Sequence, residues 1–418
     1  MSHSSPYSQE QALWRRLLLI STLALSGTLA AMAIAEVLLR IAGFTYLGFL
    51  YRSDPDLGWT LRPNLHGERW NEGGRVMFET NHDGLRDVEH AKARSNGTLR
   101  IAVLGDSFTE AQALPLKQTF WWVMQTELQR CPALEKRHVE AIDFGVSAYG
   151  PAQELIMLQK RVWAYSPDIV LLAFYAGNDV TDSSPRLNGG RPRPYFVLHD
   201  GTLVLDNSFR HSTLYRVRNH WAYQSYATLS SHLRVLQLID YARDMFHGGR
   251  IGFRLHGVLH ASSSGVPFLG SVDSFTVTTV EAGDKRLWEQ TWHTIEAILA
   301  AANQDVARHH ARFIVAVIGT SEQAYPDPAG RTAYQRLWGI NNLFSIDQRV
   351  AEIGRRDGFD VLDLAPPFQR YAETNRVFLH GYLSAIPGYG HWNALGHRVA
   401  GTLIAQHLCA LLTADGTK

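Results

Sequence analysis

The 418-residue sequence has little cysteine and almost no net charge. Its two cysteines, Cys131 and Cys409, lack C-x-x-C spacing, which argues against a metal or redox motif. The 40 Lys and Arg residues balance 39 Asp and Glu residues, and no long basic run occurs, so nucleic acid is not an expected partner. We also expect no cofactor and no bound metal. With 45% hydrophobic residues, the chain is typical of one large or two smaller globular domains.

One long apolar run lies near the N-terminus. Residues Leu17 to Ala35 carry no charge, and about 19 helical residues just span a hydrocarbon core of about 30 Å. Arg15 and Arg16 precede the run, which places the chain after Arg40 across the membrane. We therefore expect a single-pass membrane protein with an extracytoplasmic domain, periplasmic if the cell is Gram-negative. A cleaved signal peptide is the alternative, because Ala33-Ile34-Ala35 has the pattern of a cleavage site.

Apolar runs alternate with helical patterns from residue 100 onward. Nearly continuous apolar runs are typical of parallel strands that are covered on both faces. The sequence therefore predicts an α/β fold with a doubly wound parallel sheet. The predicted strands are 101–104, 138–144, 168–175, 313–318 and 359–364, and the predicted helices are 119–128, 152–163, 285–301, 346–355 and 393–412.

The chain divides into three parts. Residues 1–44 are expected to form a cytoplasmic tail and a transmembrane anchor. Residues 45–99 are interpreted as a linker that packs on the domain, because Tyr51 to Asn81 are rich in Asp, Pro, Gly and Asn. Residues 100–418 form the α/β domain. An α/β insertion at about 180–282 interrupts it, with a hairpin at Asp200-Gly201 and helices beyond it. The insertion is either a stabilising satellite or a substrate-binding lid.

Polar loops follow the predicted strands. Ser107 comes directly after the first strand, Ala148 lies in the loop after the second, Asn178 follows the third, and His391 precedes the last helix. The carboxyl ends of parallel strands meet at one edge of a sheet, so these loops are expected to lie together. A hydroxyl, a histidine and amide donors supply the nucleophile, general base and oxyanion donors of acyl transfer.

These loops resemble the four sequence blocks of the SGNH (GDSL-type) hydrolase superfamily. The matching segments are GDSFTE, GVSAYG, GND and HWNALGH, in the family's order, and the resemblance covers roughly Tyr51 to Leu412. It implies a flavodoxin-like three-layer sandwich, and the absence of G-x-S-x-G argues against an α/β-hydrolase elbow. The resemblance makes Ser107 the nucleophile and His391 the general base. It makes the Ser107 N–H and the Asn178 side chain oxyanion donors. Supporting positions in or near the blocks are Asp106, Gly145, Asp179 and Asp363.

Two positions depart from the family's pattern. Ala148 stands where the family usually has a glycine whose N–H is an oxyanion donor. The backbone N–H of Ala148 can take the same role if the backbone dihedral angles there suit alanine. The family usually has Asp two or three residues before the histidine, where this chain has Tyr389 and Gly388.

The missing aspartate leaves the orientation of His391 open. We expect a backbone carbonyl or a neighbouring side chain to orient it, so that the enzyme works as a Ser107–His391 dyad. Asp363, at the end of a strand, is the fallback carboxylate.

The implied flavodoxin-like order also concerns the cysteines. It places the first and last helices on one face of the sheet, with Cys131 and Cys409 near helix ends that lie opposite Ser107. An exported compartment permits disulfides. We therefore expect a Cys131–Cys409 bond.

Taken together, the residues and the resemblance predict an exported serine esterase. We expect its substrate to be an ester in which a carbohydrate carries an O-acetyl or other short acyl group. The enzyme is expected to remove this group through an acyl-enzyme on Ser107. One alternative is an O-acyltransferase that uses the same acyl-enzyme on an exported polysaccharide. The other is a non-catalytic glycan-binding module of SGNH type.

Overall fold

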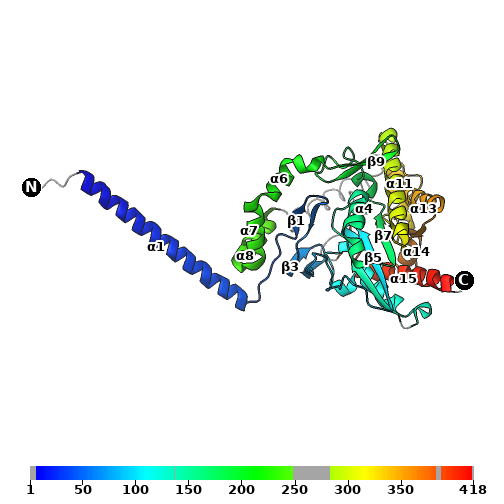
Figure 1. Ribbon diagram of the computed structural model, residues 1–418, viewed down its shortest axis with the longest axis horizontal. Helices are drawn as coiled ribbons and strands as arrows, with labels where there is room; N and C mark the ends of the chain where they lie inside the picture. The colour runs from blue at the N-terminus through cyan, green and yellow to red at the C-terminus, as the bar shows by residue number, and fades with distance from the viewer. Residues whose placement is uncertain (1–5, 136, 248–282, 383–386, 417–418) are drawn as a thin grey trace, which may run out of the picture.

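A five-stranded parallel sheet lies at the centre of the computed structural model, which describes residues 6–135, 137–247, 283–382 and 387–416 (Figure 1). The strand order is β11-β10-β7-β5-β6. When the five strands are numbered along the chain and read from the β6 edge, this order is 2-1-3-4-5. This is the flavodoxin-like order, so the predicted fold class is confirmed. The strands are β5 (Thr98–Gly105), β6 (His138–Asp143), β7 (Ile169–Tyr175), β10 (Arg312–Ile318) and β11 (Asp360–Asp363).

Helices cover both faces of this sheet, because successive strand residues point to opposite sides. Ala102 and Leu104 of β5 pack into one buried cluster, whereas Ile101 and Val103 pack into the other. The first cluster is covered by α4 (Pro151–Lys160), α11 (Lys285–Arg308) and α13 (Ser345–Asp357). The second is covered by α3 (Phe120–Leu128), α14 (Ala365–Asn375) and α15 (Ala394–Gly416).

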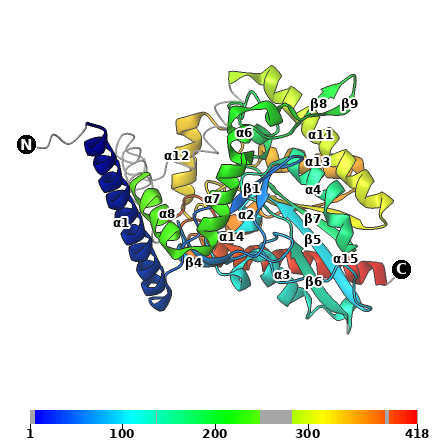
Figure 2. The same cartoon turned by 60° about the vertical axis from the view of Figure 1, so that its left-hand side comes forward.

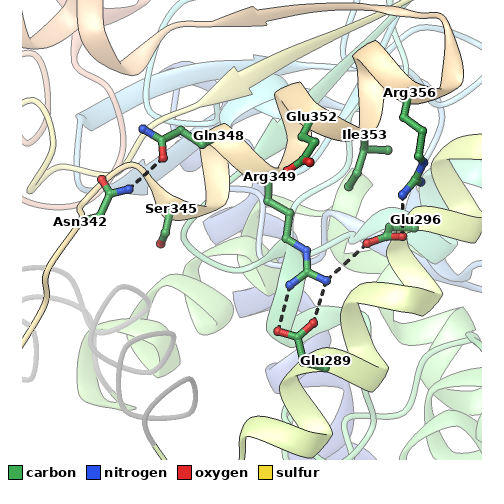
Figure 3. A pocket seen from close by; sticks show the side chains of 9 residues that line it. All are labelled: Glu289, Glu296, Asn342, Ser345, Gln348, Arg349, Glu352, Ile353 and Arg356. Atoms are coloured by element: carbon green, nitrogen blue, oxygen red, sulfur yellow. Dashed lines mark hydrogen bonds and ion pairs between the residues drawn. The ribbon is translucent and has the colours of Figure 1, made fainter.

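Charged side chains line a surface hollow between α11 and α13 (Figure 3). Arg349 of α13 forms ion pairs with Glu289 and Glu296 of α11 at 2.8 and 3.3 Å. Arg356 pairs with Glu296 at 3.1 Å. The basic groups of this hollow are thus neutralised by carboxylates across it, and the network fastens two outer helices together.

A disulfide joins Cys131 to Cys409, with 5.6 Å between their Cα atoms. Cys131 follows α3 and Cys409 lies in α15, and both helices cover the same face of the sheet. The predicted bond is therefore confirmed. It joins α15 to the chain just after α3, across a sequence separation of 278 residues.

We predict that removing this bond destabilises the protein. Closing so long a loop restricts the unfolded chain, and the chain-entropy model gives a stabilisation on the order of 4 kcal/mol or more. Thermal melts of the wild-type protein should shift downward when reductant is added, and a Cys131→Ser, Cys409→Ser double variant should melt at the lower temperature with and without reductant. Identical melting temperatures for the two proteins would contradict the prediction.

A long apolar helix, α1 (Pro6–Ile41), stands at the N-terminus. By length and composition, Leu13–Ile41 is able to cross a membrane, and its 18-residue apolar window is not buried by the protein. In Figure 1 it projects away from the sheet domain. These features fit a membrane span or a signal sequence.

Two hairpins lie in residues 45–99, where sequence analysis expected a linker. In each, the two strands pair antiparallel: β1 (Tyr51–Asp54) with β2 (Gly58–Leu61), and β3 (His66–Asn71) with β4 (Gly74–Glu79). A small core holds them to the chain that follows α1, and its buried members are Leu47, Leu50, Leu61, Leu65 and Phe78.

The insertion at about 180–282 contains the predicted hairpin. Strands β8 (Tyr195–His199) and β9 (Thr202–Asp206) pair around Asp200 and Gly201, which both have positive φ. Three helices follow: α6 (Thr213–Asn219), α7 (Trp221–His232) and α8 (Arg234–His247). The last part of the predicted insertion, 248–282, lies outside the described residues. The other α-helices in the described ranges are α2 (Ser107–Glu110), α5 (Asp179–Asp182) and α12 (Pro328–Trp338).

Candidate active site

Ser107 lies where β5 ends and the short helix α2 begins. Gly105 has φ +157°, and a Cβ atom there would lie 2.2 Å from the Thr109 Oγ1 atom, so the turn requires glycine. Asp106 caps α2, since its Oδ1 atom accepts the Phe108 N–H at 2.9 Å. The turn therefore fixes Ser107 at the carboxyl edge of the sheet.

A continuous hydrogen-bonded chain connects Ser107, His391 and Glu72. The Nε2 atom of His391 lies 2.7 Å from the Ser107 Oγ atom, and its Nδ1 atom lies 2.5 Å from the Glu72 Oε1 atom. The Glu72 side chain is mostly buried, with 16% of its surface exposed, and that of His391 is 39% exposed. A hydroxyl, an imidazole and a carboxylate in this order form the geometry of a catalytic triad.

The expected dyad is therefore wrong. A carboxylate contacts His391, but it comes from a position 319 residues earlier in the chain rather than from the histidine loop. Asp363, the fallback, instead accepts the N–H of Ala365 at 2.9 Å at the start of α14. Burial raises the pKa of Asp363, which also interacts with the buried carboxyl of Asp347.

Glu72 is held in place by the tip of the β3–β4 hairpin. The side-chain amide of Asn71 donates to the Gln112 carbonyl at 2.7 Å, which docks the tip on the chain after α2. A Cβ atom on Gly73 would lie 2.0 Å from the Ala113 carbonyl oxygen, so the close approach requires glycine. Sequence reasoning missed Glu72 because the hairpin lies in the assumed linker. The Asn71-Glu72-Gly73-Gly74 turn was the available signal.

The loop that carries His391 packs on the nucleophile helix. The ring of Phe108 lies 5.0 Å from the His391 ring, and Phe108 is buried. The Gly381 N–H donates to the His391 carbonyl at 2.8 Å, and the Tyr382 hydroxyl donates to the next carbonyl, of Trp392, at 2.7 Å. These contacts fix the imidazole against Ser107. His397, by contrast, is buried and accepts the Phe120 N–H, as expected for a structural residue.

Asn178, a predicted oxyanion donor, lies close to the nucleophile. The Asn178 side-chain amide and the Ser107 hydroxyl each lie 3.5 Å from the same Asp106 Oδ2 atom. The backbone N–H groups of Ser107 and Ala148 make no hydrogen bond with any residue that the structure describes.

Ala148 has a left-handed backbone, with φ 61°. This conformation costs a residue with a Cβ atom about 1–2 kcal/mol. Its loop is braced by Glu110, a fully buried carboxylate that accepts the N–H of Ser147. The hydroxyl of Tyr51 donates to Glu110 at 3.0 Å. Neither Glu110 nor Tyr51 was singled out from the sequence.

The supporting residues predicted from the four blocks have structural contacts at this edge. Burial raises the pKa of Asp106 to about 6, because desolvation disfavours its charged form. Asp179 accepts the Tyr175 N–H at 2.8 Å and closes the turn after β7. A Cβ atom on Gly145 would lie 2.5 Å from the Thr109 side chain, so glycine lets the second loop pack on α2.

The loops that resemble the SGNH blocks thus meet at one edge of a flavodoxin-like sheet. This is the arrangement that the resemblance implies. No protein-family model matches the sequence, and no curated protein matches it either.

Several solved structures align with the chain. An acetyl xylan esterase, AlAXEase, has a TM-score of 0.37 and 11% identity, with 74% of this chain and 99% of that one covered. A lipolytic protein of the G-D-S-L family from Desulfitobacterium hafniense has a TM-score of 0.33 and 11% identity, with 74% and 99% covered. A catalytic mutant of an acetylxylan esterase from Geobacillus stearothermophilus has a TM-score of 0.35 and 11% identity, with 76% and 96% covered.

We predict that Glu72→Gln lowers kcat for ester hydrolysis by up to about 10⁴-fold, the loss found when serine proteases lose the charge of their triad carboxylate. The amide keeps the shape of the side chain but removes the charge that stabilises imidazolium. Turnover of p-nitrophenyl acetate by the purified variants measures the effect.

The matched control is Glu79→Gln, which changes an exposed carboxylate at the other end of the same hairpin and should leave activity unchanged. Asp363→Asn should also change it little. A large loss with Asp363→Asn and none with Glu72→Gln would contradict the assignment of Glu72.

Proposed function

We propose that the chain is an exported serine esterase of SGNH type that removes an O-acetyl or other short acyl group from a carbohydrate. The observation that carries the proposal is the Ser107–His391–Glu72 chain of hydrogen bonds beside Asn178, at the carboxyl edge of a parallel sheet. The order of the four SGNH-like blocks supports the same reaction class. The carbohydrate rests on the sequence interpretation.

In the proposed reaction, the Ser107 Oγ atom attacks the ester carbonyl while His391 Nε2 accepts its proton. Glu72 accepts the Nδ1–H of His391 and stabilises the imidazolium that forms. The oxyanion is bound by the N–H groups of Ser107 and Ala148 and by the Asn178 amide. His391 then protonates the leaving alcohol, and water releases the acyl group from Ser107 by the same steps.

Sequence analysis left two alternatives open, a non-catalytic glycan-binding module and an O-acyltransferase. The case for a non-catalytic module depended on the missing carboxylate, and Glu72 now supplies a carboxylate beside His391. An O-acyltransferase would use the same acyl-enzyme, with a sugar hydroxyl in place of water.

We further propose that α1 remains as a single-pass anchor with the esterase domain on the extracytoplasmic side. Two observations support the anchor over a cleaved signal sequence. The helix continues without a break past Ala35 to Ile41, and its last turns bond to the insertion: Arg40 donates to the His232 carbonyl at 2.9 Å.

We predict that Ser107→Ala lowers turnover of p-nitrophenyl acetate to less than about a hundredth of the wild-type value without lowering the melting temperature, since loss of a nucleophile typically costs about 10⁶-fold. Asn178→Ala should cost less, about 10²- to 10³-fold, as expected for one oxyanion donor. Substantial activity in Ser107→Ala, or an equal loss in both variants, would reject these roles.

We predict that the wild-type protein releases acetate from an acetylated oligosaccharide, measured by chromatography of the products. Release in water without an added acceptor identifies the hydrolase. Transfer of the acetyl group from the oligosaccharide to the hydroxyl of an added polysaccharide, in place of acetate release, would identify the acyltransferase instead.

A further inference from the structure

The helix α8 buries two polar side chains and exposes several apolar ones. Gln237 and Asp240 are fully buried. The Tyr46 N–H donates to Gln237 at 3.0 Å, and the Tyr226 hydroxyl donates to Asp240 at 3.1 Å. A hydroxyl from Ser230 also donates to Asp240. Buried polar groups that are bonded in this way fasten α8 to the protein through its polar face.

The opposite face of α8 is apolar and exposed. Leu238, Ile239 and Met245 have 41%, 53% and 40% of their surface exposed. At about 100° per residue, Val235, Leu238 and Met245 fall on one stripe with Ile239 at its edge. A surface helix of a water-soluble domain usually shows the reverse pattern, with its apolar stripe against the core. We call the exposed Leu238, Ile239 and Met245, together with the partly buried Val235, the outer face of α8; the exposed Arg243 borders it next to Ile239.

The first turn of α8, where the outer face begins, contacts the last turns of α1. The Val235 N–H donates to the Glu36 Oε2 atom of α1 at 3.0 Å, and Arg40 pairs with Glu36 at 2.7 Å. Glu36 is the first charged residue after the uncharged run that ends at Ala35. Figures 1 and 2 both show α8 next to the C-terminal half of α1. If the uncharged run Leu17–Ala35 fills the hydrocarbon core, the start of α8 is therefore held at the depth where hydrocarbon ends.

The neighbouring helices expose residue types that favour a membrane surface. Trp221 at the start of α7 is 73% exposed, and Arg216 and Arg218 lie just before it on exposed positions of α6. Tryptophan is enriched where membrane meets water, and arginine interacts favourably with anionic headgroups.

We propose that the outer face of α8 lies in the membrane surface that carries α1, as a second, interfacial contact of the protein with the same bilayer. The occupant is lipid: apolar side chains enter the boundary between headgroups and acyl chains to a depth of about 5–10 Å, while Gln237 and Asp240 face the protein. The proposal rests on the anchor of the proposed function, and it fixes the tilt of the esterase domain relative to the membrane.

Site-directed fluorescence in lipid nanodiscs tests this contact on the full chain. Both native cysteines are disulfide-bonded, so Ile239→Cys and Leu238→Cys each introduce one thiol for labelling with bimane. The matched control is Glu352→Cys on the exposed side of α13, which lies far from α8 in both views. Each label is exposed to a nitroxide-bearing lipid and, separately, to aqueous iodide. Unchanged ester turnover verifies that each labelled protein is folded.

We expect the lipid quencher to remove most of the fluorescence at positions 238 and 239 and iodide to remove little, with the opposite result at position 352. Quenching by iodide at all three positions places the outer face in water and overturns the proposal. Protection from both quenchers at 238 and 239 shows that protein covers the face, either another segment of this chain or a second copy, and also overturns it. Mass spectrometry of the same preparation detects loss of α1 separately, so failure of the anchor is distinguished from failure of the contact.

Discussion

The hydrogen bond between His391 and Glu72 is the contact on which the candidate site depends. It joins a loop from the end of the sheet domain to a hairpin that precedes the first sheet strand. The Glu72 carboxylate lies on the Nδ1 side of the imidazole at 2.5 Å, where it stabilises a positive charge on the ring. The hairpin therefore supplies a residue of the candidate site, although it lies outside the central sheet.

The position of Glu72 follows from close backbone packing. Gly73 admits the Ala113 carbonyl, and Asn71 bonds to Gln112, so the hairpin tip is fixed to the residues just after the nucleophile helix. At its other side the hairpin contacts α8, where the ring of Trp70 lies 5.5 Å from that of Tyr241. The hairpin that carries Glu72 thus also packs on α8.

Local sequence signals predicted the fold because they depend on neighbours in the chain. Apolar runs defined each sheet strand, and Gly105 and Asp106 marked the turn that presents Ser107. The flavodoxin-like order then brought Cys131 to Cys409. The turn around Glu72 marked a hairpin but not the contact with His391, which joins residues 319 positions apart. The Pro- and Gly-rich segment around it resembled a linker. Likewise, nothing local revealed that the polar face of α8 is buried.

The tautomer of His391 is the most direct measure of the role of Glu72. ¹⁵N NMR of protein labelled at histidine reports which ring nitrogen carries the proton, and a His391→Gln variant assigns its signals among the 19 histidines. The contacts predict a neutral imidazole protonated at Nδ1, with Nε2 free to accept from Ser107, and loss of this preference in Glu72→Ala. A proton on Nε2, or a tautomer unchanged by Glu72→Ala, would contradict the account.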